Sequence, residues 1–258
     1  MGKTATGAKT KVKTTRLDAT GVYYRELNER IRELIREGYR EIVLDGVNGQ
    51  RYIGDAVTEK VDIVINGVPG NDLGVFMDGP TITVNDNAQD GVGNTMNSGK
   101  IVIKGHAGDV IGYGMRGGKV FVTGNIGYRV GIHMKSYNEQ VPVVVGGGGA
   151  GDFFGEYMAG GILVLLGLDL DGAPLVGSYL GTGMHGGAVY LRGEVEEHQL
   201  GREVRPYDLD EEDGRLLNGL LKEFQGDTGI DISGVSIQEF TKLQPFSHRP
   251  YGNMYCYL

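Results

Sequence analysis

The stretch DLGVFMDGPTITVNDNAQDGVGNTMNSGKIVIKGHAGDVIGYGMRGG, residues 72–118, contains one short pattern three times. In each copy a glycine stands three residues before a methionine, and the three methionines are nineteen residues apart. Three further copies follow, the last two after insertions of five and seven residues. The six pairs are Gly74 and Met77, Gly93 and Met96, Gly112 and Met115, Gly131 and Met134, Gly155 and Met158, Gly181 and Met184. A fixed period near twenty residues indicates a stack of similar structural units.

A short segment of alternating apolar residues accompanies every copy. The segments are Ile63/Ile65, Ile82/Val84, Ile101/Ile103, Val120/Val122, Val143/Val145, Leu163/Leu165 and Val189/Leu191, and Ile42/Leu44 resemble an earlier one. Alternation over a few residues between glycines is typical of a β-strand and not of a helix. Nineteen residues leave room for two or three short strands and tight corners, so the sequence predicts an all-β core built as a parallel β-helix.

The repeated columns have different expected roles in this solenoid. The glycine column is typical of corners that need a positive φ or leave no room for a Cβ atom. The methionine column, and an apolar residue four positions before each methionine, should fill the interior. Two glycine runs, residues 112–117 and 181–186, also spell the dinucleotide fingerprint G-x-G-x-x-G. Both lead into another strand where that motif requires a helix, so we interpret them as corners.

Composition excludes several classes of protein. Forty-six of 258 residues are glycine, without a collagen triplet register. The net charge of −8 argues against a nucleic-acid partner. No apolar run is long enough to span a membrane and no apolar signal segment is present, so we expect a cytoplasmic protein. The single cysteine, Cys256, excludes an internal disulfide and a cysteine-ligated iron–sulfur cluster within one chain.

Three regions are expected along the chain: an arm and an amphipathic helix in residues 1–40, the β-helix in residues 41–193, and a helical or irregular extension in residues 194–258. Residues 1–16 are predicted to be disordered or loosely docked. The helix at residues 20–37 should cover the open first coil, or alternatively bind a partner. The insertions at residues 135–142 and 168–174 should project from corners, where function usually lies.

The C-terminal region shows two helix patterns. Residues 208–224 carry acidic residues followed by an apolar face, and residues 236–243 begin with the capping pair Ser236 and Glu239. Residues 245–258 contain four aromatic residues and are expected to pack on the far end of the β-helix.

Few residues suggest chemistry. Asp72, Asp90, Asp109 and Asp152 lie near one corner, and we interpret them mainly as turn formers bonded to nearby backbone, with a cation held by Asp90 and Asp109 as the alternative. The histidines share no metal-ligand spacing, and no nucleophile, base and acid can be assembled. We therefore predict no catalytic, cofactor-binding or metal site in this chain.

Several segments resemble the C-terminal GXGXG domain of the glutamate synthase large subunit. The repeats DVIGYGMRGG at residues 109–118 and GEYMAGG at residues 155–161 carry the likeness, which covers residues 41–193. NGQRYIG at residues 48–54 and SHRPYGN at residues 247–253 resemble the stand-alone version of that domain. The resemblance implies a right-handed parallel β-helix, and the helical patterns described above add helices that flank it at both ends. The same repeat also occurs in one of the subunits of formylmethanofuran dehydrogenase.

The resemblance implies an architectural role. Family members with all parts hydrolyse glutamine at an N-terminal cysteine and form glutamate at an FMN and iron–sulfur domain. This chain begins Met1-Gly2-Lys3, so those residues are not carried over. We expect a non-catalytic subunit of a split glutamate synthase, with amidotransferase and FMN/iron–sulfur subunits as partners that hold the cofactors. The alternatives are a subunit of a formylmethanofuran dehydrogenase-like complex, a free-standing β-helix enzyme and a self-assembling homo-oligomeric scaffold.

Overall fold

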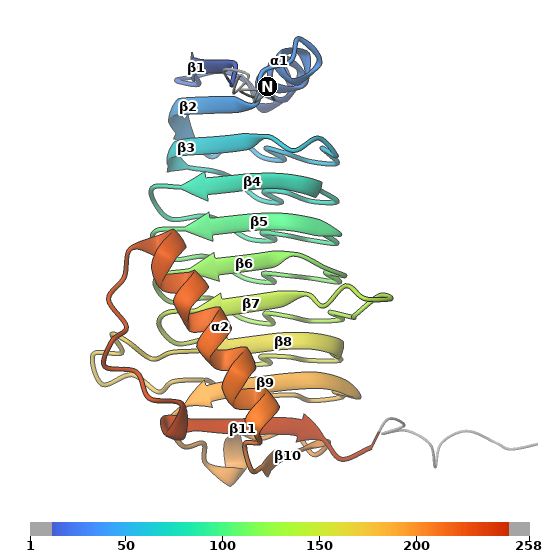
Figure 1. Ribbon diagram of the computed structural model, residues 1–258, viewed down its shortest axis with the longest axis vertical. Coiled ribbons are helices and arrows are strands. Elements are labelled where there is room, and N and C mark those ends of the chain that lie inside the picture. Colours follow the sequence, from blue (N-terminus) through green and yellow to red (C-terminus); the bar gives the residue numbers. More distant parts are fainter. Residues whose placement is uncertain (1–11, 248–258) are drawn as a thin grey trace, which may run out of the picture.

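A computed structural model describes residues 12–247 of the protein. The core is one sheet of stacked strands, in the order β1-β2-β3-β4-β5-β6-β7-β8-β9-β11-β10 (Figure 1). The nine strands that follow one another are β1 (Thr14–Asp18), β2 (Glu41–Asn48), β3 (Asp62–Val68), β4 (Asp78–Val84), β5 (Ser98–Ile103), β6 (Lys119–Val122), β7 (Val143–Gly146), β8 (Ala159–Leu165) and β9 (Gly186–Arg192). These nine strands pair with one another in parallel throughout. The predicted parallel β-solenoid is confirmed, and its handedness stays a prediction.

The register of the sheet follows the sequence repeat. Ile63 pairs with Ile82, Ile82 with Ile101, and Ile101 with Val120, so each of these turns advances the chain by nineteen residues. The two insertions lie between β6 and β7 and between β8 and β9, where Val120 pairs with Val144 and Leu163 with Val189. Like residues therefore stand above one another at the roughly 4.8 Å spacing of paired strands.

The interior holds the residues of the repeated columns. All six methionines are fully buried and belong to one continuous apolar cluster with Ile63, Ile82 and Ile101. All six glycines have φ between 68° and 74°. Their missing side chains matter as well, because a Cβ added at Gly131 would lie 2.7 Å from Leu163 Cδ1. These corners thus combine a left-handed backbone with crowding from an interior side chain.

The first coil has a strand and a helix beside it. Helix α1 (Tyr24–Arg36) contributes Leu27, Ile31 and Leu34 to the same interior cluster as Ile42 and Leu44. Strand β1 pairs with β2 at the edge of the sheet. The prediction of a loose arm over residues 1–16 is therefore wrong for residues 14–16, because the sheet edge gives their backbone groups partners. Residues 1–11 lie outside the described part of the chain.

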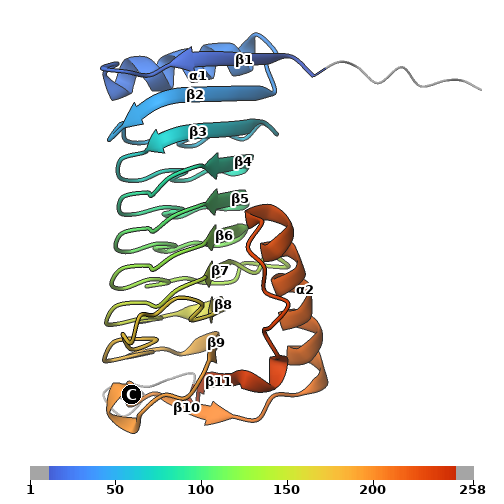
Figure 2. The ribbon, with the colours of Figure 1, turned by 90° about the vertical axis from the view of Figure 1, so that its left-hand side faces the viewer.

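The C-terminal region covers the side of the solenoid. Helix α2 (Glu211–Thr228) runs along the stack beside β5 to β9 (Figure 2). Its residues Leu217, Leu221 and Phe224 pack on the outward side chains of the sheet, among them Phe121 and Val145. This helix therefore buries the outer face of the sheet and does not cap an end.

The predicted helix at residues 236–243 is wrong. The capping pair Ser236 and Glu239 opens one 3-10 turn, η2 (Ile237–Glu239), after which β11 (Phe240–Pro245) pairs antiparallel with β9. Pairing with a strand edge outweighs a local capping signal, because capping is worth only about 1 kcal/mol. Strand β10 (Val204–Tyr207) completes the sheet, after the short turn η1 (Glu197–Gln199). Most of the predicted packing of residues 245–258 concerns residues outside the described part.

Candidate partner-binding surface

The corner before each buried methionine has an unusual backbone. Counting back from each methionine, the first, third and fifth residues have positive φ in all six copies. The first-position residues are Phe76, Thr95, Gly114, His133, Tyr157 and Gly183, and the fifth-position residues are Asp72, Gly91, Val110, Arg129, Phe153 and Tyr179. In the first five corners, the backbone N–H groups of the three left-handed residues donate alternately to the next coil and to the preceding coil. The N–H of Phe76 donates to Asn94 O in the next coil at 2.9 Å, and that of Gly74 to Ile53 O in the preceding one at 2.9 Å.

Residues with a side chain at these positions hold their backbone in an unfavourable conformation. A left-handed conformation costs a residue with a Cβ roughly 1–2 kcal/mol, and glycine avoids this cost. Glycine occupies the first position in two coils, yet other coils place His133 and Tyr157 there. Strained, bulky residues that remain outside the core indicate selection for something other than folding.

Five of these residues, together with the neighbouring Tyr113, form a surface that we call the aromatic corner: Tyr113, Arg129, His133, Phe153, Tyr157 and Tyr179. The ring of His133 stacks on Tyr157 with centroids 5.4 Å apart and forms a T-shaped contact with Tyr113 at 5.9 Å between centroids. Phe153 stacks on Tyr179 at 5.0 Å. The rings thus continue from coil to coil along one edge of the solenoid, and Tyr179 remains 56% exposed.

Arg129 is fixed within the aromatic corner by two contacts. Its guanidinium lies 4.5 Å from the centroid of the Phe153 ring and forms an ion pair with the buried carboxylate of Glu156. The backbone oxygen of Glu156 also accepts the N–H of His133. A pre-ordered arginine among aromatic rings is the composition that dominates binding energy at protein interfaces.

A small hairpin follows this corner in the chain. It starts directly after Met134, and Tyr137 and Gln140 exchange two backbone hydrogen bonds of 3.0 Å. Tyr137 and Val141 are both exposed. The first insertion therefore projects as a short ordered element that carries a further exposed aromatic side chain.

The aspartates at this corner bond to a neighbouring coil. Asp90 Oδ1 accepts the N–H of Asp109, Asp109 Oδ1 that of Tyr128, and Asp152 Oδ1 that of Ser178, at 2.8 to 2.9 Å. These are the expected bonds to nearby backbone, and that backbone belongs to the following coil. Asp72 instead accepts from the Asn94 amide. In residues 12–247 no group of three or more His, Cys, Asp or Glu side chains could hold a metal ion.

A parallel ladder contains the first histidine of the chain. Asn87 Oδ1 accepts the N–H of His106, His106 Nδ1 that of Asn125, and Asn125 Oδ1 that of Gly149. His106 therefore occupies the position that Asn87 and Asn125 hold in the neighbouring coils, and its Nδ1 serves as the hydrogen-bond acceptor. This role ties coils together and provides no general base.

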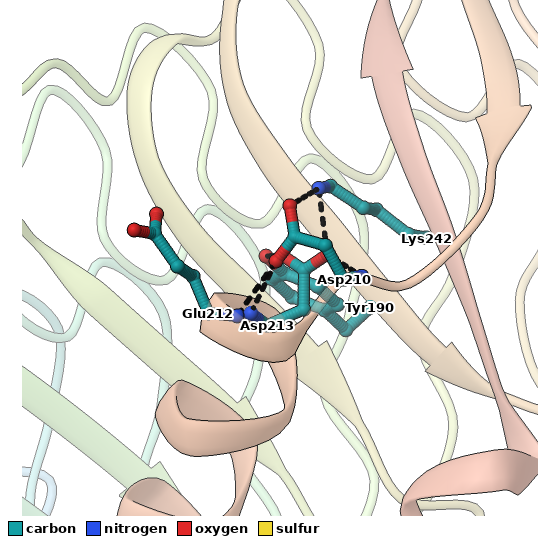
Figure 3. A network of polar contacts seen from close by, with 5 residues as sticks. All are labelled: Tyr190, Asp210, Glu212, Asp213 and Lys242. Atoms are coloured by element: carbon teal, nitrogen blue, oxygen red, sulfur yellow. Dashed lines mark hydrogen bonds and ion pairs between the residues drawn. The ribbon is translucent and has the colours of Figure 1, made fainter.

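A buried polar network joins α2 to the sheet (Figure 3). Lys242 Nζ donates to Asp213 Oδ2 at 2.7 Å, and the Tyr190 hydroxyl donates to Asp213 Oδ1 at 2.6 Å. Burial alone would raise the pKa of Asp213, but the hydrogen bonds from Lys242 and Tyr190 lower this pKa below its ordinary value. Burial, with donation to Asp213, raises the pKa of Tyr190. All three groups are satisfied by one another, so the network anchors the helix.

The glycine and methionine columns predicted from the sequence lie on the inner side of the solenoid corner, and the aromatic corner lies on its outer side. The glycine and methionine columns face inward, while the aromatic corner uses the residues between them. The sequence contained a signal for the aromatic corner, since the column just before each methionine holds Phe76, His133 and Tyr157 in three of its six copies. The second fingerprint glycine in each run, Gly114 and Gly183, belongs to that column. Both runs lead into strands, β6 and β9, so they lack the helix that a dinucleotide site requires.

The fold and this surface define a β-solenoid repeat protein that has one exposed aromatic edge. The chain belongs to the GXGXG motif family, whose model matches residues 9–247. It is also similar to the uncharacterized protein MJ1350 of Methanocaldococcus jannaschii, with 49% identity over 248 residues, which cover 93% of this chain and 95% of that protein. Neither helix in residues 12–247 has the length and apolar character needed to cross a membrane.

Proposed function

We propose that this chain is a non-catalytic assembly subunit of a split glutamate synthase, the complex that forms glutamate from glutamine and 2-oxoglutarate. In this role it braces separate amidotransferase and FMN/iron–sulfur subunits in the cytoplasm. Membership of the GXGXG family across residues 9–247 supports the proposal, together with the resemblance of the repeats to the C-terminal domain of the large subunit. The FMN and the iron–sulfur cluster belong to the partner subunits.

The aromatic corner is the observation that carries the assembly role. Phe153, Tyr157 and Tyr179 accept a strained backbone, and their rings remain at the surface with Arg129. Burial of aromatic rings and an ordered arginine by a partner would provide binding energy that repays the strain. We therefore assign the aromatic corner to contact with a partner subunit.

Purification of the tagged chain from its native organism tests this function. The expected result is recovery of an amidotransferase chain and an FMN/iron–sulfur chain, with glutamine-dependent glutamate formation by the eluate. Recovery with formylmethanofuran dehydrogenase subunits would contradict the proposal and favour the alternative complex. Turnover of a substrate by the purified chain alone would instead indicate a free-standing enzyme.

A matched pair of variants tests the role of the aromatic corner. Tyr157→Gly removes a ring and relieves the left-handed strain. The free energy of unfolding of the isolated chain should therefore stay within about 1 kcal/mol of the wild-type value. Recovery of the partners should nevertheless fall by about tenfold or more. Tyr207→Ala removes an exposed ring from β10 and should leave recovery unchanged. Equal recovery with both variants would exclude the aromatic corner as the contact.

A further inference from the structure

The outer face of the sheet continues past the end of α2 onto β2, β3 and β4. Helix α2 lies beside β5 to β9, and in residues 12–247 no helix lies over the outward side chains of the three earlier strands (Figure 2). The register places five outward side chains in one column, Val43, Val64, Thr83, Val102 and Phe121. Val102 and Phe121 are almost fully buried, whereas the first three remain half-buried. The apolar column that α2 covers therefore extends onto a part of the sheet that α2 leaves uncovered.

A second column, two residues earlier on each strand, holds α2 in place by charge. Lys100 on β5 pairs in the sheet with Lys119 on β6. Lys100 Nζ lies 2.7 Å from a carboxylate oxygen of Glu223 and 2.5 Å from one of Asp227, and Lys119 forms a further ion pair with Glu223. Helix α2 thus packs apolar residues on one column and places two carboxylates, one helical turn apart, over the lysines of the other.

The same charged column reverses its sign where α2 ends. Glu41 pairs with Asp62, Asp62 with Thr81, and Thr81 with Lys100. Asp62 is exposed and Glu41 is half-buried, and neither carboxylate forms an ion pair with another residue of 12–247. The uncovered coils therefore place two adjacent carboxylates where the covered coils place two adjacent lysines.

We call the uncovered part of the sheet the open face, and its residues are Glu41, Val43, Asp62, Val64 and Thr83. From its likeness to the seat of α2, we infer that the open face binds an amphipathic helix of a partner chain that carries basic residues. The apolar side of that helix covers Val43 and Val64, and two lysines or arginines one turn apart meet the carboxylates. A second copy of this chain does not fit, because two open faces would bring like charges together. This contact is additional to the aromatic corner and does not depend on which complex the chain enters.

Two synthetic peptides test the charge of the partner helix. Both have the sequence of residues 211–228 and are held helical by a hydrocarbon staple on the side away from the sheet, and one of them carries Glu223→Lys and Asp227→Lys. Fluorescence anisotropy with the full chain should show that the lysine peptide binds about tenfold or more tightly than the unaltered peptide. This preference should shrink as salt rises, because partly exposed charges are screened. The unaltered peptide competes poorly for the seat of α2, since the attached helix holds that seat at high effective concentration.

Variants of the chain locate the binding. Asp62→Lys should reverse the preference between the two peptides. Val64→Glu adds a carboxylate but removes an apolar contact, so it should weaken the lysine peptide by about tenfold or more. Asp169→Lys makes the first charge change at an exposed position in the second insertion, and it should leave both affinities unchanged.

Urea titration checks that each variant folds, and Asp62→Asn, which is nearly isosteric, should reduce the preference if Asp62→Lys does not fold. Equal affinity of the two peptides for the wild-type chain would overturn the inference. A preference that Asp62→Lys and Asp62→Asn leave unchanged would do so too, since the charge would then be recognised elsewhere. All these measurements use the isolated chain, so their outcome is separate from that of the proposed glutamate synthase assembly.

Discussion

Each coil places two demands on one corner glycine, a left-handed backbone and the absence of a side chain. At Gly131 both demands are severe, since an added Cβ would approach three atoms of Leu163 at 2.7 to 3.3 Å. Gly172, in the second insertion, also has a positive φ but has no atom within 4 Å of an added Cβ. The two positions therefore separate backbone strain from crowding.

Gly131→Ala should lower the free energy of unfolding by about 2–4 kcal/mol, from left-handed strain and overpacking together. Gly172→Ala should cost only about 1 kcal/mol, since strain alone acts there. Urea titration of both variants measures the difference. Equal losses would mean that Leu163 moves aside without cost and that crowding does not select the glycine.

The methionine side chains of the column stabilise the fold by filling volume in the interior. Met115 is fully buried, so Met115→Ala should lower the free energy of unfolding by about 2–5 kcal/mol through the cavity that it leaves. Met115→Leu conserves volume and should cost less than about 1.5 kcal/mol. The same titration compares them, and a near-neutral alanine variant would show that the interior collapses around the lost side chain.

Among the elements, α2 is the one whose position the sequence left open. The strands were predictable because their alternation repeats with the coil. Yet β7 and β8 read VVVG and AGGILVL, with apolar residues on both faces, whereas β4 alternates Thr81 and Thr83 outward. Strands that are apolar on both faces are typical of a sheet covered on both sides. This signal could have placed an apolar helix over the later coils.

The errors in the C-terminal region have a different origin. The capping pair Ser236 and Glu239 is real and forms in the structure, but the four residues that follow pair with β9 as a strand. Sequence alone cannot weigh a local cap against pairing with an edge strand far away in the chain, as Phe240 pairs with Arg192, because the edge exists only once the stack has formed. The same reason hides β1, whose partner is the exposed edge of β2.

Asp213 links α2 to β9 and β11, so its charge should contribute to the stability with which α2 packs on the sheet. Within the described residues, Asp213→Asn leaves the buried Lys242 with one carboxylate partner, Asp210 at 3.9 Å, and should lower the free energy of unfolding at pH 7 by about 3 kcal/mol. Glu212→Gln removes an exposed charge from the same turn and should cost under about 1 kcal/mol. Urea titrations at pH 7 measure both.

The pH dependence of this linkage has a definite sign. The pKa of Asp213 lies below its ordinary value in the folded protein, so the carboxylate stabilises the fold at any pH above the unfolded value of about 3.9. That contribution disappears as the pH falls through the lower, folded pKa. The gap in stability between wild type and Asp213→Asn should therefore narrow between pH 5 and the most acidic pH at which both still fold. A constant gap over that range would show that the Asp213 charge is not coupled to folding.

At the scale of the whole molecule, a solenoid transmits little from one end to the other. Each strand pairs only with its immediate neighbours, and the first coil depends on Leu27, Ile31 and Leu34 of α1 for cover. Stability in such a stack is close to a sum of nearest-neighbour terms. A defect at one end should therefore open that end without unfolding the middle.

Leu34→Ala tests this locality. The side chain is 1% exposed, and its loss should cost about 2–5 kcal/mol within the first coil. Hydrogen exchange followed by mass spectrometry should show faster exchange in α1, β1 and β2, while β5 and β6, which lie mid-stack, keep their protection. Glu33→Ala, on the exposed face of α1, provides the control with unchanged exchange. Uniform loss of protection from β2 to β9 in Leu34→Ala would instead show that the solenoid unfolds as one cooperative unit, and that its ends and its centre share a single stability.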